Sequence, residues 1–146
     1  TAKIPHDWEF NHDAIGFNYR MPNINAAMGC AQIERLPDFL RRKRILANKY
    51  AKAFASVSGV TFFNEPDNCT SNYWLNVIIL DKDKSILRDE ILFRLNKEKR
   101  MSRPAWRPNH QLPMFSKSPH SDLSVAESLY ARLINIPSSP SIIDSG

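Results

Sequence analysis

The sequence predicts an α+β fold in which a small, mostly antiparallel sheet is covered on one side by helices. Runs rich in aromatic and β-branched residues indicate strands near residues 60–64, 73–80, 101–106 and 134–136. Between them lie segments whose apolar residues recur at helical spacing. Strands and helices in this order are typical of the α+β class. The chain has 146 residues, 42% of them hydrophobic and 24% charged, which fits one globular domain.

The first expected elements are a polar, irregular segment over residues 1–22 and a long helix over residues 24–56. Asn23 is suited to cap this helix, because its side chain can accept from the free N–H groups of the first turn. Pro37 lies inside the apolar pattern and should kink or divide the helix, since proline removes a backbone donor and clashes with the preceding turn. Cys30 falls among apolar residues and is predicted to be a small core residue.

The later elements follow from the same patterns. The strongest strand is expected at residues 73–80, YWLNVIIL, with Tyr73 and Trp74 in the core of the sheet. Helices are predicted over residues 85–97, with Ser85 as the cap, and over residues 122–133. Pro104 confines the strand at residues 101–106 to an edge or an end. The loop over residues 107–121 is long for a structureless connection, which indicates a functional segment.

Charge and composition narrow the classes of partner. The formal net charge is +5, but the basic residues cluster on predicted helices, where such runs are usually solvated faces. Nucleic-acid binding is not expected, because no stacking aromatic surface or known module accompanies them. No signal peptide or transmembrane run is evident, so no membrane partner is expected and the cytoplasm is the default location. The four histidines and two cysteines are not at ligand spacing, so no metal site is predicted.

A polar loop stands directly before the predicted long helix. Asn18, Tyr19 and Arg20 place an amide, a phenol and a guanidinium on adjacent residues, which suits an anionic, phosphate-like partner. A helix N-terminus beside such a loop is a plausible anion site. Most loops of this kind are only connections. The residues by themselves therefore leave both a binding role and a purely structural role open.

Five segments, in order, resemble the DegT-type sugar aminotransferases, which are fold type I enzymes that use pyridoxal phosphate. They are HDAIGFNYRMPNINAAMGCAQIE, SNYWLNVIIL, RPAW, H-x-x-P-M-F and AESLYARLINIPSSP, and they cover nearly the whole chain. The resemblance implies the C-terminal domain of such an enzyme, with a small and mostly antiparallel sheet. It looks closest to the branch that aminates UDP-linked 4-keto-6-deoxy amino sugars for surface glycans of the bacillosamine or legionaminic type.

The resemblance also implies that the catalytic residues lie in a segment upstream of this chain. In the family the Schiff-base lysine lies before the position of Thr1, so no residue of this chain is predicted to be catalytic, and the chain alone is expected to be inactive. The start at Thr1, without Met, reads as the interior of a longer protein. Residues 1–23 are assigned to the interface with the large domain or a second subunit, and residues 24–146 to the small C-terminal domain. The implied partners are a missing N-terminal large domain and a second copy in a homodimer.

The binding residues follow from the resemblance in the same way. In the family, a loop of one subunit reaches the cofactor phosphate of the other, which carries over to Asn18, Tyr19 and Arg20. The candidates for the nucleotide-sugar pocket are Arg103, Trp106 and His110. Two alternatives stay open, since His110 could instead fix its own loop and Trp106 could instead pack in the core.

The implied reaction moves an amino group, from glutamate, to the C4 keto group of a UDP-linked 6-deoxy sugar. Pyridoxal phosphate is the cofactor that the resemblance implies for the intact enzyme, and this chain alone is not expected to bind it. A non-catalytic module for dimerisation and substrate binding is the alternative function.

Overall fold

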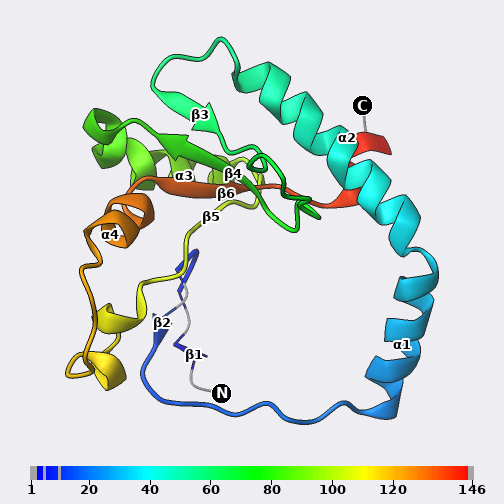
Figure 1. Cartoon of the computed structure of the whole chain (residues 1–146), viewed down its shortest axis with the longest axis horizontal. Coiled ribbons are helices and arrows are strands. Elements are labelled where there is room, and N and C mark those ends of the chain that lie inside the picture. The colour runs from blue at the N-terminus through cyan, green and yellow to red at the C-terminus, as the bar shows by residue number, and fades with distance from the viewer. Residues whose placement is uncertain (1–2, 5, 10, 145–146) are drawn as a thin grey trace.

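The computed structural model describes residues 3–4, 6–9 and 11–144, and these residues form an α+β fold (Figure 1). Its main sheet is antiparallel throughout and has the strand order β3-β4-β6-β5. The strands are β3 (Val60–Phe62), β4 (Asn76–Leu80), β5 (Arg103–Pro104) and β6 (Leu133–Ile136). The predicted class and the small antiparallel sheet are confirmed.

Burial alternates along the central strand β4, as expected for a sheet with one face in the core. Ile78 is buried and lies opposite Phe62 of β3 and Ile134 of β6. A row of apolar side chains therefore crosses three strands on one face. β5 is an edge strand, as Pro104 predicts, because proline has no N–H to donate to a further neighbour.

Two helices cover this apolar face, α2 (Leu36–Phe54) and α3 (Arg88–Lys97). Ala47 of α2 and Leu92 of α3 belong to the same buried cluster as the row of sheet residues. Leu92 has no exposed surface. The short helix α4 (Ser124–Tyr130) lies at one end of the sheet and leads into β6 (Figure 1). A 3-10 helix, η1 (Lys82–Leu87), precedes α3, so Ser85 lies inside η1 and does not cap α3.

The predicted long helix is divided in two, as Pro37 indicates. Helix α1 (Asn23–Glu34) ends one residue before α2 begins, and Arg35 stands between them. Pro37 lies in the first turn of α2, where its missing N–H would have no partner within the helix. Helix α1 buries none of its residues, and Ile24 is 72% exposed.

Two expectations for α1 are wrong. Asn23 is the first residue of the helix, and the cap position is Pro22, whose carbonyl accepts from the N–H of Ala26 at 3.1 Å. The proline ring has no hydrogen-bond acceptor, so α1 has no side-chain cap. Cys30 is exposed and not a core residue, because nothing in the described chain packs against that face of α1.

The N-terminal segment was predicted to be irregular, but it contains a short antiparallel pairing of β1 (Lys3–Ile4) with β2 (Asn11–His12). Strands of two residues are too short to show a periodic pattern. The part of the predicted interface segment at residues 1–2, 5 and 10 lies outside the described residues. Residues 13–22, here called the strap, then run without regular structure from β2 to α1 (Figure 1). In the described ranges, no helix combines the length and the apolar content that crossing a membrane requires.

Candidate functional site

The strap carries the three residues predicted to bind a phosphate. Asn18, Tyr19 and Arg20 are all exposed, and Tyr19 is 91% exposed. The rings of Phe17 and Tyr19 stack with their centroids 5.9 Å apart, which stiffens the strap locally. Residues 13–20 line a hollow of about 820 Å³. The donor groups of the strap are therefore accessible to an anion.

Chemically, this donor set fits the phosphate of pyridoxal phosphate. Arg20 forms no hydrogen bond or ion pair with another residue of the described ranges, so its guanidinium is available to an oxyanion. The amide of Asn18 and the phenol of Tyr19 add two neutral donors next to it. The strap does not enclose a ligand by itself, since all its residues from Asp13 to Pro22 are exposed.

A second candidate surface is a depression of about 610 Å³ at the end of the sheet where β4 begins and β6 ends. It brings together two of the predicted substrate residues, Arg103 and Trp106, and adds Trp74. The indoles of Trp74 and Trp106 stack, with ring centroids 5.9 Å apart and an interplanar angle of 24°. Both remain exposed, Trp74 by 66% and Trp106 by 47%.

The exposure of Trp74 corrects the expectation that it lies in the sheet core. Strand β4 starts only at Asn76, and Tyr73 has a φ of 45°, so the alternation of the strand does not extend back to Trp74. Tyr73 does pack against the core cluster. Trp106 is 47% exposed, so the core does not enclose it, and a substrate-binding role for it stays a prediction.

Lys43 of α2 builds the wall beside Trp74. Its ammonium donates to the carbonyls of Tyr73 and Trp74, each at 3.1 Å, and to that of Ser138 at 2.8 Å. Partial burial lowers the pKa of Lys43 below its ordinary value. The three hydrogen bonds use all three donors of the ammonium, so Lys43 fixes backbone and has no donor left for a ligand.

Arg103 is held less firmly. Its Nη1 lies 3.4 Å from Oδ1 of Asn96 and 3.5 Å from the carbonyl oxygen of Ser102, at the outer limit of hydrogen bonding. Asn135, which is buried in the floor, donates to the carbonyl of Pro104 at 2.9 Å and so fixes the edge strand next to Arg103. The guanidinium can therefore turn toward an anion in the depression without breaking a strong contact.

His110 lies apart from this depression. Its Nε2 is 2.7 Å from Oε1 of Glu127 on α4, and its ring centroid is 5.3 Å from that of His120. The hydrogen bond from His110, followed by one from Gln111, lowers the pKa of the Glu127 carboxyl. Nδ1 of His110 is buried without a partner in the part of the chain that the structure describes. These contacts fit the alternative in which His110 fixes its loop, and a binding role for it stays a prediction.

The described ranges contain no cluster of three His, Cys, Asp or Glu residues arranged to hold a metal ion. Two residues of the depression, Lys43 and Trp74, were not predicted as site residues. Lys43 sits in a run of basic residues assigned to a solvated face, and Trp74 sits in a strand pattern.

Comparison with known proteins decides the family. The sequence profile of the DegT/DnrJ/EryC1/StrS aminotransferase family matches residues 2–145. The chain belongs to this family.

Curated relatives in the DegT/DnrJ/EryC1/StrS family agree. The chain is 37% identical over 134 residues to a GDP-perosamine synthase of Escherichia coli O157:H7, covering 92% of this chain and 35% of that protein. It is also 37% identical over 133 residues to EpsN of Bacillus subtilis (strain 168), whose name describes a pyridoxal phosphate-dependent aminotransferase; that match covers 88% of this chain and 34% of EpsN. The chain thus spans about a third of the length of the curated relatives it matches.

Solved structures of other proteins share the fold. The aminotransferase TlmJ from Streptoalloteichus hindustanus superposes with a TM-score of 0.75 at 26% identity, covering 94% of this chain and 37% of that one. DesI, solved in the presence of its TDP-sugar product, gives a TM-score of 0.77 at 25% identity, covering 86% of this chain and 32% of DesI. The α+β arrangement is therefore that of a part of these larger proteins.

Proposed function

We propose that this chain is the C-terminal part of a pyridoxal phosphate-dependent aminotransferase that transfers an amino group, from glutamate, to a keto group of a nucleotide-linked sugar. Membership of the family supports the reaction class. The match to about a third of each curated relative supports a second, larger region that carries the catalytic lysine. Residues 1–23 would lie at the interface with that region or with a second subunit of a homodimer.

The observation that carries the proposal is the outward-facing donor set of the strap. Pyridoxal phosphate, when bound, supplies an electron sink for the amino transfer. Arg20 and Asn18 would hold its phosphate, with Tyr19 beside them. Because the strap is exposed and runs well apart from the sheet of its own chain (Figure 1), the phosphate it holds would belong to the active site of the partner subunit. A charge-assisted hydrogen bond of this kind contributes roughly 1.5–3 kcal/mol.

The depression beside β4 and β6 would take part of the nucleotide sugar. Arg103 carries the positive charge that a diphosphate requires, and Trp106 offers a flat apolar face for a sugar or a base. His110 would contribute through its loop, since its Nε2 is engaged by Glu127. The three residues therefore divide into two that face the depression and one that lies outside it.

The sugar substrate is the finer part of the proposal. The motifs YRMPNINAA, SNYWLN and RPAW favour a UDP-linked 4-keto-6-deoxy sugar, whereas two of the relatives quoted above are named for GDP- and TDP-linked sugars. Turnover by the full-length enzyme with UDP-, GDP- and dTDP-linked 4-keto-6-deoxy sugars separates them. A kcat/KM for the UDP-linked sugar below that for the GDP-linked one would contradict the UDP assignment.

Arg20→Ala in the full-length enzyme tests the phosphate role. We expect the dissociation constant for pyridoxal phosphate to rise by at least about tenfold, because a charge-assisted bond is lost, while the KM for the nucleotide sugar stays nearly constant. Arg94→Ala is the matched control, since Arg94 is exposed on α3 and pairs with Glu90 one turn earlier on the same helix. An unchanged cofactor affinity in Arg20→Ala would remove the strap from the phosphate site.

A further inference from the structure

Within the part of the chain that the structure describes, the strap is fastened at its two ends. All residues of the strap, 13–22, are exposed, and none of them is part of the core cluster. At one end the chain continues into α1, which joins α2 through Arg35. At the other end it follows β2 and the segment 6–9. The place of Asn18 and Arg20 in space therefore depends on how firmly these two ends are held.

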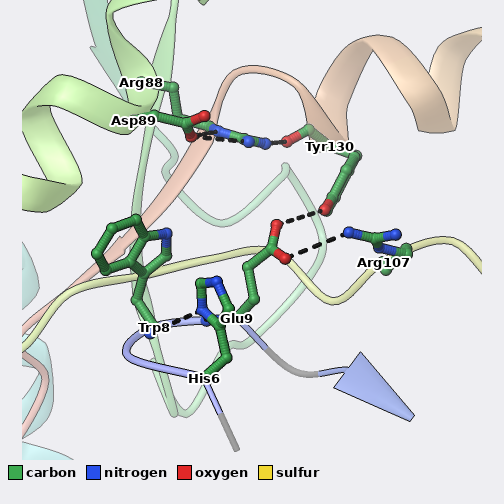
Figure 2. Close-up of polar contacts among 7 residues, drawn as sticks. All are labelled: His6, Trp8, Glu9, Arg88, Asp89, Arg107 and Tyr130. Carbon is green, nitrogen blue, oxygen red and sulfur yellow. Dashed lines mark hydrogen bonds and ion pairs between the residues drawn. The ribbon is translucent and has the colours of Figure 1, made fainter. Parts of the chain in front are cut away.

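A polar clasp holds the first end to the rest of the domain (Figure 2). The clasp consists of Glu9, Arg107 and Tyr130. One carboxylate oxygen of Glu9, Oε2, accepts from Nη2 of Arg107 at 3.2 Å, and Oε1 accepts from the hydroxyl of Tyr130 at 3.4 Å. Glu9 thereby ties the N-terminal segment to two elements that lie far along the sequence. The Glu9 side chain is 21% exposed and that of Arg107 is 37% exposed, so solvent screens the pair only in part.

Tyr130 is itself held from the opposite side by Arg88 (Figure 2). The guanidinium of Arg88 lies 5.1 Å from the centroid of the Tyr130 ring, and its Nη1 donates to the backbone carbonyl of Tyr130 at 2.7 Å. Asp89 accepts from Nε of Arg88 at 2.9 Å and keeps that side chain in place. Arg88 therefore holds Tyr130 in the place from which its hydroxyl donates to the carboxylate of Glu9.

A local turn over residues 6–9 directs the side chains of Trp8 and Glu9 toward the rest of the domain. Nδ1 of His6 accepts from the backbone N–H of Trp8 at 3.3 Å and of Glu9 at 3.0 Å. The His6 and Trp8 rings meet edge to face at 5.3 Å, and Trp8 packs against the core cluster. The apolar contact of Trp8 and the polar contacts of Glu9 thus fasten neighbouring residues.

We infer that Glu9 is a positioning residue for the strap, and that it sets how well Asn18 and Arg20 meet the cofactor phosphate. This inference rests on the phosphate role proposed above. Both carboxylate oxygens of Glu9 are engaged by Arg107 and Tyr130, so Glu9 acts through the strap and not on the phosphate itself. Holding one end of the strap reduces the conformations it must give up on binding, and preorganisation of this kind raises affinity.

The test is a double-mutant cycle in the full-length enzyme, with Glu9→Gln, Arg20→Ala and the double variant. Glu9→Gln keeps the shape of the side chain and removes its charge. We expect it to weaken pyridoxal phosphate binding about fivefold, the lower range for coupling between sites, measured by titration of the cofactor absorbance. In the Arg20→Ala background the same change should have little further effect. Glu90→Gln, which removes an exposed ion pair on α3, is the matched control.

Each outcome decides a different statement. An equal loss from Glu9→Gln in both backgrounds would mean a general effect on the fold and would overturn the positioning role. A loss in Arg20→Ala together with no loss in Glu9→Gln would also overturn it, while the proposed function stands. No loss in Arg20→Ala would contradict the phosphate role instead.

A second readout tests the clasp without reference to the cofactor. Trypsin cleaves after arginine, and Arg20 lies in the exposed strap. In the full-length enzyme the proposed interface covers the strap, so cleavage after Arg20 requires the strap to open. If Glu9 restrains the strap, Glu9→Gln should speed this cleavage about fivefold in the cofactor-free full-length enzyme, followed by mass spectrometry, while Glu90→Gln should not. An unchanged cleavage rate would overturn the restraint.

Discussion

Two regions of this molecule are held in different ways. The packed layer, formed by β3 to β6 with α2 and α3, contains every residue of the buried core cluster. The arm, formed by the strap and α1 over residues 13–34, contains no buried residue. Hydrophobic burial stabilises the first. Among the described residues, the second is positioned by its attachments at both ends, namely the contacts of Trp8 and Glu9 and the junction with α2.

The difference separates stability from chemistry. The packed layer can lose little without unfolding, and its buried side chains have no access to a ligand. The arm contributes little to the core, yet it presents Asn18, Tyr19 and Arg20 outward. Its helix also exposes apolar side chains, with Ile24 at 72% and Met28 at 62%. Apolar surface of this kind is typical of a face that another polypeptide covers, in line with the proposed dimer or large domain.

The largest expected effect is a difference in the free energy of unfolding between one substitution in the packed layer and one in the arm. Ile134→Ala in β6 removes a fully buried side chain and should lower the free energy of unfolding of the 146-residue chain by about 2–5 kcal/mol. Ile24→Ala in α1 changes a side chain that is 72% exposed and should change it by no more than about 0.5 kcal/mol. Urea unfolding followed by circular dichroism measures both. Equal losses would show that α1 has a buried partner and would break the comparison.

A smaller effect is expected where polar contacts join the packed layer to its loops. Lys43→Met leaves the carbonyls of Tyr73, Trp74 and Ser138 without their donor, which should cost about 2 kcal/mol of unfolding free energy. Lys49→Met, at an exposed position of the same helix, is the control and should be nearly neutral. If both variants unfold at the same urea concentration as the unaltered chain, the ammonium of Lys43 does not stabilise this wall of the depression.

The sequence predicted the packed layer better than the arm. The strands at β4 and β6 follow from local β-branched runs, and the edge position of β5 and the helix break near Pro37 follow from the chemistry of proline. Helical spacing on α1 showed an apolar stripe but could not show that the described chain leaves it uncovered. Cys30 was misplaced for this reason.

The candidate site was predicted only in part, because some of its residues come from segments that lie far apart in the sequence. Arg103 and Trp106 lie close in sequence and share one depression, as expected of the RPAW motif. Trp74 joins them from the segment that precedes β4, and Lys43 comes from a basic run on α2, where its ammonium donates to backbone carbonyls. The contacts of Glu9 connect distant segments, and no local pattern carries that information.

The smallest expected effect depends on pH and concerns the ion pair that ties α2 to the loop before β4. Arg44 donates to both carboxylate oxygens of Glu65, at 3.0 and 3.2 Å, and the N–H of Ser71 donates to the same carboxylate. The hydrogen bond from Arg44, followed by that from Ser71, lowers the pKa of Glu65 below its ordinary value of 4.5. A carboxyl whose pKa is lower in the folded state stabilises the fold fully above the ordinary value, and loses this contribution as the pH falls through the folded value.

Glu65→Gln should therefore destabilise the chain at pH 7 by less than Lys43→Met does, since the pair is partly exposed and screened. The gap between Glu65→Gln and the unaltered chain should narrow as the pH falls below about 4.5, because the unfolded chain then binds a proton at Glu65 before the folded chain does. The contribution of the charge is lost once the pH has fallen through the lower pKa of the folded state. Urea unfolding at several pH values measures the gap, and Glu34→Gln, at an exposed carboxylate of α1, controls for the change in net charge. A gap that stays constant down to strongly acidic pH would show that the charge of Glu65 does not hold the loop, and that packing alone joins it to α2.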